Sequence, residues 1–179
     1  MKKDIERILI TKEEIAEKVK KLANEIKCEY EGKNPLILCI LKGSLIFTAD
    51  LVRELDFPCE IDFMRVSSYR MSAVTTGEIN IKQDVSTDIR DRDVIIVEDI
   101  LDTGVTLSKL VPILKGRGAR SVALCVLLNK PERRTVEVKA DYIGFDIENE
   151  FVVGYGLDYA EKYRNLPYVG ILKREVYEK

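Results

Sequence analysis

Three carboxylates follow an apolar run near the middle of the chain, in the stretch VIIVEDILDTGVT at residues 94–106. Glu98 and Asp99 are adjacent, and Asp102 follows after two apolar residues. Carboxylates can hold the hydroxyls of a sugar or a magnesium ion. The small residues that come next could place backbone N–H groups around a phosphate at a helix start. The acids would repel a bare phosphate, so the pattern indicates a ligand that also carries hydroxyls or a metal.

A helix start explains part of this stretch without any ligand. Asp-Thr-Gly is common where helices begin, because short polar side chains cap the helix and a first-turn acid favours its dipole. That explanation covers DTG alone. It leaves open why two further acids stand at the end of an apolar strand, so we favour a binding site for the whole run 94–106.

The sequence contains no histidine. This excludes Ser-His-Asp and Cys-His catalysis and every histidine-ligated zinc site. Any proton transfer must therefore use Asp, Glu, Lys, Tyr or Cys. The cysteines, at positions 28, 39, 59 and 125, match no metal-binding spacing, and we expect them to be reduced thiols.

Strands and helices are expected to alternate along the chain. TKEE at 11–14 is a capping box, and apolar residues recur behind it at helical spacing. Alternation of this kind predicts an α/β fold with a mostly parallel central sheet flanked by helices. Ligands in such sheets bind beyond the carboxyl ends of the strands, where the acids of 94–106 would lie. We expect strands at 36–41, 59–66, 79–85, 94–98, 121–128, 141–147 and 168–172, and further helices at 44–55 and 106–115.

Composition favours one folded domain over residues 1–179, long enough to bury a core. The net charge is −2, and no basic block suits a nucleic-acid backbone. The longest apolar run, at 35–41, is far shorter than the roughly 20 residues that span a bilayer, and no signal peptide is visible. We therefore expect a cytoplasmic protein with no nucleic-acid or membrane partner.

Several segments, in the same order, resemble the type I phosphoribosyltransferases, and within them the 6-oxopurine branch. The run 94–106 resembles the family's phosphoribosyl diphosphate fingerprint. LKGS at 41–44, LLNKPERR at 127–134 and FVVGYGLDYAEKYRNLP at 151–167 resemble further family motifs, so the resemblance covers nearly the whole chain. It implies the type I phosphoribosyltransferase fold, with a small hood built from the N- and C-terminal segments.

The resemblance implies roles for the acidic run. Glu98 and Asp99 would hold the ribose hydroxyls, and Asp102 would lie near the purine N7 as the general base. The loop at 102–106 would bind the ribose 5′-phosphate. Its members are Asp102, Thr103, Gly104, Val105 and Thr106.

The resemblance also implies a pyrophosphate site. Lys42 and Gly43 would form the pyrophosphate loop, in which the family often has a cis peptide before the lysine, and Arg164 would contact the same group. Ser44 stands where the family often has Gly or Ala, a difference that we expect to be harmless. Taken alone, LKGS could equally be a strand end and a turn.

Four residues are assigned to the purine by the same resemblance. Lys130 would donate to O6 of the base, which favours a 6-oxo purine over adenine. Phe151 would stack on the base, and the backbone of Val152 would contact its Watson–Crick edge. Asp158 would line this site and, with Glu98 and Asp99, contribute to a magnesium site. Taken singly, Lys130 could be a solvated lysine and Phe151 a core residue.

Residues 67–78 lack any periodicity, and the resemblance identifies them with the family's mobile lid, with Ser68 and Tyr69 at its working end. A plain surface loop is the alternative. The chemistry gives a lid a purpose, because oxocarbenium character at the ribose C1 must be kept from water. The lid would span about 67–85, and a purine-binding hood segment about 141–179.

Together these motifs imply magnesium-dependent transfer of 5-phosphoribosyl from its α-1-diphosphate to N9 of hypoxanthine or guanine. The partners would be these small molecules and, as the family implies, further copies of the chain in a dimer or tetramer. Other possibilities are a xanthine-preferring transferase, a pyrimidine-operon RNA-binding regulator and an interaction module with a vestigial site. Lys130, the 151–159 segment and the missing basic face count against the regulator.

Overall fold

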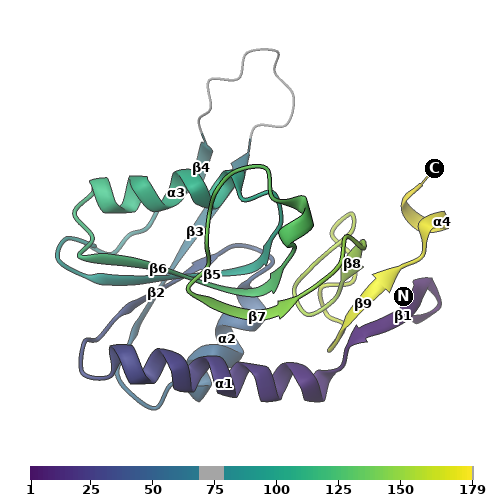
Figure 1. Ribbon diagram of the computed structural model, residues 1–179, viewed down its shortest axis with the longest axis horizontal. Coiled ribbons are helices and arrows are strands. Elements are labelled where there is room, and N and C mark those ends of the chain that lie inside the picture. Colours follow the sequence, from purple (N-terminus) through teal and green to yellow (C-terminus); the bar gives the residue numbers. More distant parts are fainter. Residues whose placement is uncertain (69–78, 179) are drawn as a thin grey trace.

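The computed structural model describes residues 1–68 and 79–178, which form a six-stranded sheet and a three-stranded sheet (Figure 1). The larger sheet has the order β4-β3-β2-β5-β6-β7 and the smaller one the order β1-β9-β8. The strands are β1 (Ile5–Ile10), β2 (Leu36–Ile40), β3 (Glu60–Ser68), β4 (Ile79–Gln83), β5 (Asp93–Leu101), β6 (Ser121–Asn129), β7 (Tyr142–Asp146), β8 (Val152–Val153) and β9 (Val169–Leu172). The helices are α1 (Lys12–Tyr30), α2 (Leu45–Glu54), α3 (Val105–Gly116) and α4 (Arg174–Tyr177), with short 3-10 turns at Lys2–Asp4 and Pro131–Arg133.

Helices cover both faces of the larger sheet. In Figure 1, α1 and α2 lie below the sheet and α3 lies above it. Successive strand residues point to opposite faces, so Ile37 and Ile95 pack in the cluster that holds α1, whereas Leu36 and Leu38 pack with α3. Burial on both faces explains why these strands are continuous apolar runs in the sequence.

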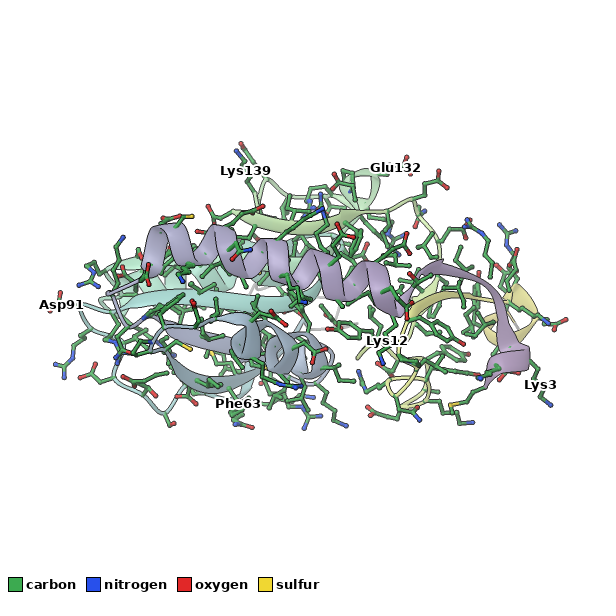
Figure 2. The ribbon with its side chains drawn as sticks, turned by 90° about the horizontal axis from the view of Figure 1, so that it is seen from below. Lys3, Lys12, Phe63, Asp91, Glu132 and Lys139 are labelled. Carbon is green, nitrogen blue, oxygen red and sulfur yellow. The ribbon has the colours of Figure 1, made fainter. Side chains whose placement is uncertain are left out.

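Helix α1 begins at the capping box that the sequence predicted. The Thr11 hydroxyl accepts a hydrogen bond from Glu14 N at 3.2 Å, and the Glu14 carboxylate accepts one from Thr11 N at 2.8 Å. Figure 2 shows α1 lying along the sheet from Lys12 towards the end where Asp91 lies. None of the described helices is long and apolar enough to cross a bilayer. The buried stripe of α1 comprises Ile15, Val19, Leu22, Ala23, Ile26 and Tyr30.

The strand order changes direction at β2. Strands β3 and β4 lie on one side of β2, and β5, β6 and β7 lie on the other. The pairing of β2 with β5 ends at Cys39 opposite Val97, whereas β5 stays paired with β6 until Leu101 lies opposite Asn129. Residues 98–101 therefore extend beyond β2. A crevice at such a reversal is where ligands bind in open α/β sheets.

The three-stranded sheet joins the two ends of the described chain. Strand β1 pairs antiparallel with β9, which pairs antiparallel with β8. We call β1, β8, β9 and α4 the hood, which lies beside the larger sheet at the right of Figure 1. The hood has its own buried cluster, made by Val153, Tyr163, Leu166 and Leu172. The predicted fold class, a mostly parallel sheet with helices and a hood of terminal segments, is confirmed.

Several elements differ from the sequence prediction, and β8 and α4 were not predicted at all. The central strand was expected at 94–98 but runs from Asp93 to Leu101, so Glu98 and Asp99 lie within it rather than after it. The reason is that β6 continues to offer backbone partners there. No strand was predicted at residues 5–10, where β1 forms because β9 pairs with it. The strand expected at 79–85 does pair with β3 and ends at Gln83.

Candidate functional site

The paired acids of β5 lie in the crevice between β2 and the loop after β5. Their carboxyl groups face each other, and burial together with the charge of Asp99 raises the pKa of Glu98 well above its ordinary value. Burial also raises the pKa of Asp99, although Asp99 accepts a hydrogen bond from Ile100 N at 2.9 Å. Such a pair is stabilised by a cation or by hydroxyl donors, which is what a magnesium-bound sugar would supply.

A small polar cavity of about 180 Å³ opens between the end of β5 and the start of α3. Gly104 precedes α3 with φ of 84°, a conformation that favours glycine. A Cβ atom there would lie 2.5 Å from Val138 Cγ1, so the loop has no room for a side chain. Free N–H groups at the start of α3 suit a bound anion. The cavity is lined by Glu98, Asp102, Thr103, Gly104 and Thr106 among others. Val105 is not among the lining residues, and its N–H donates to the Thr103 hydroxyl at 3.5 Å.

Asp102 lies on the border of two cavities. It lines the 180 Å³ cavity and also a larger one of about 560 Å³ between β5 and the hood. One of its carboxylate oxygens, Oδ1, accepts a hydrogen bond from Arg133 Nε at 3.1 Å. A carboxylate in this position can reach ligands in both cavities, as a general base between a ribose phosphate and a base must.

Three segments meet at closely packed glycines beside the acids. The peptide bond between Leu41 and Lys42 is cis, as the resemblance implied. A Cβ atom on Gly43 would lie 1.7 Å from Asp99 Oδ2, and one on Gly156 would lie 1.9 Å from the Gly43 carbonyl oxygen. Gly43 thus joins the loop after β2 both to the acids of β5 and to the 151–167 segment. Gly156 was not identified from the sequence, although its position in FVVGYG was the available signal.

Lys42 and Arg164 come together through a carboxylate that the sequence analysis missed. Glu161 Oε2 accepts from Lys42 Nζ at 2.9 Å and lies 3.5 Å from Arg164 Nη2. Asp158 Oδ1 lies 2.8 Å from the same Arg164 nitrogen, and Arg164 Nη1 donates to the Gly156 carbonyl at 2.8 Å. Two cations around one exposed carboxylate form a place where an anion such as diphosphate could bind. The only sequence signal for Glu161 is its spacing from Asp158 and Arg164.

The larger cavity has the size of a small-molecule site, and its lining is mainly polar. Lys130 is buried rather than solvated, and its Nζ donates to the Glu150 carbonyl at 2.6 Å. Burial lowers the pKa of Lys130. Phe151 is 37% exposed, which is unusual for a core residue. Lys130 is therefore not a solvated lysine, and Phe151 is not a typical core residue. Val152 also lines the cavity.

Phe151 has two aromatic neighbours. Tyr159 meets it edge-on, with ring centroids 5.6 Å apart, and Tyr177 stacks on it at 4.6 Å. Tyr163 belongs to the hood cluster, and Tyr159 packs against it. Tyr177, from α4, lines the cavity and was not identified from the sequence, because its contact with Phe151 joins positions 26 residues apart.

Of the remaining candidate residues, Asp158 and Ser68 are not among the residues that line the two cavities. Asp158 lies with Arg164 and is not among the residues that line the larger cavity. Its second oxygen accepts from Glu161 N at 2.9 Å. Ser68 is the last residue of β3 and pairs with Ile79. Tyr69 and the rest of the expected lid up to residue 78 lie outside the described residues, so the lid stays a prediction.

Oxygen ligands for magnesium are present but dispersed. Across residues 1–68 and 79–178, no three Cys, Asp or Glu side chains converge as a metal site would require. Magnesium commonly takes only one or two protein carboxylates and completes its shell with water and substrate phosphates. The Glu98 and Asp99 pair, and separately Asp158, therefore fit a magnesium ion that shares its shell with a phosphorylated substrate.

The chain is similar in sequence and in structure to known phosphoribosyltransferases. Residues 6–160 match the family described as phosphoribosyl transferase domain. The chain is 52% identical over 178 residues to hypoxanthine-guanine phosphoribosyltransferase of Bacillus subtilis, covering 99% of each. It is also 52% identical over 177 residues to the bifunctional protein TilS/HprT of Listeria monocytogenes, of which it spans only 27%. The crystal structure of a hypoxanthine phosphoribosyltransferase from Staphylococcus aureus superposes with a TM-score of 0.96 at 45% identity, over 100% of this chain and 97% of that one.

Proposed function

This chain belongs to the phosphoribosyl transferase domain family, and we propose that it is a purine salvage enzyme. It transfers 5-phosphoribosyl from 5-phospho-α-D-ribose 1-diphosphate to N9 of hypoxanthine or guanine, and it releases IMP or GMP and pyrophosphate. The observation that carries the proposal is the position of Asp102, on the border of a phosphate-sized cavity and a base-sized one. The resemblance to the 6-oxopurine branch is confirmed by similarity over the whole chain.

The smaller cavity would hold the ribose phosphate. The carboxylates of Glu98 and Asp99 accept hydrogen bonds from the ribose hydroxyls, which relieves the crowding of the two acids. The 5′-phosphate accepts hydrogen bonds from the N–H groups and hydroxyls of the 102–106 loop, in which Gly104 packs against Val138. The ribose C1 then faces the larger cavity.

The diphosphate would lie between the loop after β2 and the 158–164 segment. Lys42 and Arg164 provide positive charge there, and Gly43 allows the backbone to approach closely. When bound, magnesium would neutralise charge on the leaving diphosphate. Glu98, Asp99 and Asp158 are the residues that would hold it, mainly through substrate and water oxygens.

The base would bind in the larger cavity. Lys130 donates a hydrogen bond to O6, which matches a 6-oxo purine and opposes the 6-amino group of adenine. Phe151 stacks on the ring, and the Val152 backbone contacts the Watson–Crick edge. As N9 attacks C1 and the C1–oxygen bond to diphosphate breaks, the Asp102 carboxylate accepts the N7 proton.

The proposal includes a self-associated, cytoplasmic enzyme that acts on small molecules. The support for self-association is a largely apolar groove of about 490 Å³ along α1 and α2, together with Leu45, which is 47% exposed at the start of α2. Light scattering after size-exclusion chromatography should give the mass of a dimer or tetramer. A monomer at micromolar concentration would contradict this part of the proposal.

A spectrophotometric assay tests the reaction. The protein is mixed with magnesium, phosphoribosyl diphosphate and hypoxanthine, guanine, xanthine or adenine in separate reactions. We expect turnover with hypoxanthine and guanine, none with adenine, and loss of activity when a chelator removes magnesium. The xanthine reaction determines whether the enzyme prefers that base. Absence of turnover with every purine would refute the proposed function.

A further inference from the structure

The C-terminal helix carries an aromatic ring into the candidate base site. Tyr177, in α4, stacks on Phe151 with centroids 4.6 Å apart and planes 20° apart. Both rings line the cavity of about 560 Å³ that also contains Lys130 and Asp102. Phe151 is nevertheless 37% exposed, so its ring needs neighbours to hold it at one angle.

The position of α4 is fixed by the hood rather than by the contact with Phe151 alone. Lys173 N donates to the Asp4 carbonyl at 3.0 Å, which ties the start of α4 to the residue before β1. Leu172 N donates to the Phe151 carbonyl at 2.9 Å, so β9 holds the Phe151 backbone as well. The side chains of Val176 and Tyr177 pack against the hood cluster. The fold thus brings the two rings together from two directions.

The volume of the larger cavity shows that Tyr177 does not fill the site. With Tyr177 in place it still has about 560 Å³, within the range of about 300–1,000 Å³ that is usual for small-molecule sites. Tyr177 is therefore part of the wall and leaves room for a ligand. A ring has two faces, and Tyr177 covers one face of Phe151. Tyr159 contacts Phe151 in a T-shaped arrangement with planes 87° apart and is not among the residues that line the cavity.

We propose that Tyr177 is a positioning residue for the purine, which supports one face of Phe151 so that the other face stacks on the base. This inference rests on the proposed function, in which Phe151 stacks on hypoxanthine or guanine. The support acts on base binding alone, because Tyr177 lies in the larger cavity and is not among the residues that line the phosphate cavity.

The test separates base binding from chemistry. Stacked aromatic pairs are worth enough that Tyr177→Leu should raise the KM for hypoxanthine by about two- to tenfold. The kcat and the KM for phosphoribosyl diphosphate should not change. Tyr177→Phe keeps the ring and should restore the KM of the wild type. Tyr168→Leu is the matched control, because Tyr168 packs against the same hood cluster but is absent from the cavity lining.

The direction in which Tyr177→Leu changes the KM for hypoxanthine determines whether the inference is correct. If Tyr177→Leu lowers the KM for hypoxanthine, the tyrosine competes with the base and the inference is wrong. An unchanged KM, or an equal rise in Tyr168→Leu, would also overturn it. Wild-type turnover in the same assay shows that the proposed function holds, so the two failures are distinguishable.

A second variant keeps the test independent of the folding of Tyr177→Leu. The chain has no tryptophan, so Tyr177→Trp places a single indole in the wall of the cavity. Titration with IMP should change its emission, with saturation at the concentration that inhibits the forward reaction. An active Tyr177→Trp enzyme whose emission does not change at saturating IMP would contradict a place for this residue against the ring that stacks on the base.

Discussion

The position of Asp102 allows a direct test of proton transfer at the scale of one residue. Asp102→Asn keeps the size of the side chain but cannot accept the N7 proton. We expect kcat to fall by about 10²- to 10⁴-fold, the usual contribution of a general base. Binding of phosphoribosyl diphosphate with magnesium, measured by calorimetry, should be nearly unchanged. Near-normal turnover in this variant would remove the general-base role.

Gly43 should tolerate no side chain, because a Cβ atom would lie 1.7 Å from Asp99 Oδ2. Gly43→Ala must therefore displace either the Lys42 loop or the acidic pair. We expect loss of measurable binding of phosphoribosyl diphosphate, while circular dichroism shows a folded protein. Gly116→Ala is the control, since nothing lies within 4 Å of a Cβ atom there. Equal binding by both variants would show that the site does not depend on this contact.

Glu161 should compete with diphosphate, because its carboxylate contacts both Lys42 and Arg164. Glu161→Gln removes the negative charge and should lower the inhibition constant for pyrophosphate by about two- to fivefold, a modest change because exposed ion pairs are weak. Glu13→Gln, at an exposed position in the first turn of α1, serves as the control for net charge. Weaker pyrophosphate inhibition in Glu161→Gln would mean that Glu161 positions the cations instead.

Sequence analysis was most informative for residues whose neighbours in the chain reveal them. Glu98, Asp99 and Asp102 could be identified because they follow an apolar run and precede a helix start. Glu161 and Tyr177 could not, since each depends on a contact with a segment that only the folded chain brings near. Gly156 lies in the FVVGYG motif, which the sequence analysis identified, but its close contact with Gly43 could not be predicted from the sequence.

Among the elements, β3 is tied to the segment after β4 by one buried carboxylate. Asp62 accepts hydrogen bonds from Ser86 N and Thr87 N, both at 2.8 Å. Burial alone would raise the pKa of Asp62, but the backbone hydrogen bonds from Thr87 and Phe63 outweigh it and lower the pKa to about 2. The folded form is therefore stabilised by ionised Asp62 above about pH 4, and this stabilisation is lost as pH falls towards 2.

Asp62→Asn should accordingly lower the free energy of unfolding by up to about 2 kcal/mol at pH 7. Urea unfolding measured between pH 7 and pH 3 should show the difference from the wild type shrinking as the pH falls. Asp141→Asn is a control for the general loss of a carboxylate, because its side chain accepts only one hydrogen bond in the described structure, from Leu124 N. A difference that is independent of pH would refute the role of charge at Asp62.

Element boundaries show where local sequence stops being sufficient. The capping box at Thr11 gave the start of α1 correctly, because this signal is local. The end of β5 depends on backbone partners in β6. The sequence prediction ended this strand at residue 98, because acidic residues are uncommon inside a buried strand. Strand β1 exists through its pairing with β9, about 160 residues away, and its own sequence has no clear alternation.

At the scale of the whole molecule, the two cavities and the hood should act as one ligand-binding unit. A ligand present at about 100 times its Kd stabilises the folded state by about 2.7 kcal/mol, which corresponds to a Tm increase of about 5–10 °C for a chain of this size. We expect such an increase with magnesium and phosphoribosyl diphosphate together, and a much smaller one with ribose 5-phosphate alone, which lacks the diphosphate. Equal increases with the two ligands would argue against a diphosphate site at Lys42 and Arg164.

The overall architecture was accessible from the sequence because alternating elements and several ordered motifs agreed with one another. The path of the chain at the switch between β2 and β5 brings those motifs to one edge of the sheet. Which base the proposed enzyme would prefer could not be predicted from the sequence, because the contacts expected at the Watson–Crick edge would be made by the backbone of Val152 rather than by a side chain. The assay with separate purines supplies that information.

Calorimetric titration of magnesium and phosphoribosyl diphosphate into the protein tests the central claim, that the acids leaving β5 hold an activated ribose. The wild type should bind with a stoichiometry of one per chain, and the Glu98→Gln, Asp99→Asn double variant should show at least a tenfold weaker interaction while remaining folded. Undiminished binding in the double variant, or no heat with the wild type, would contradict the account.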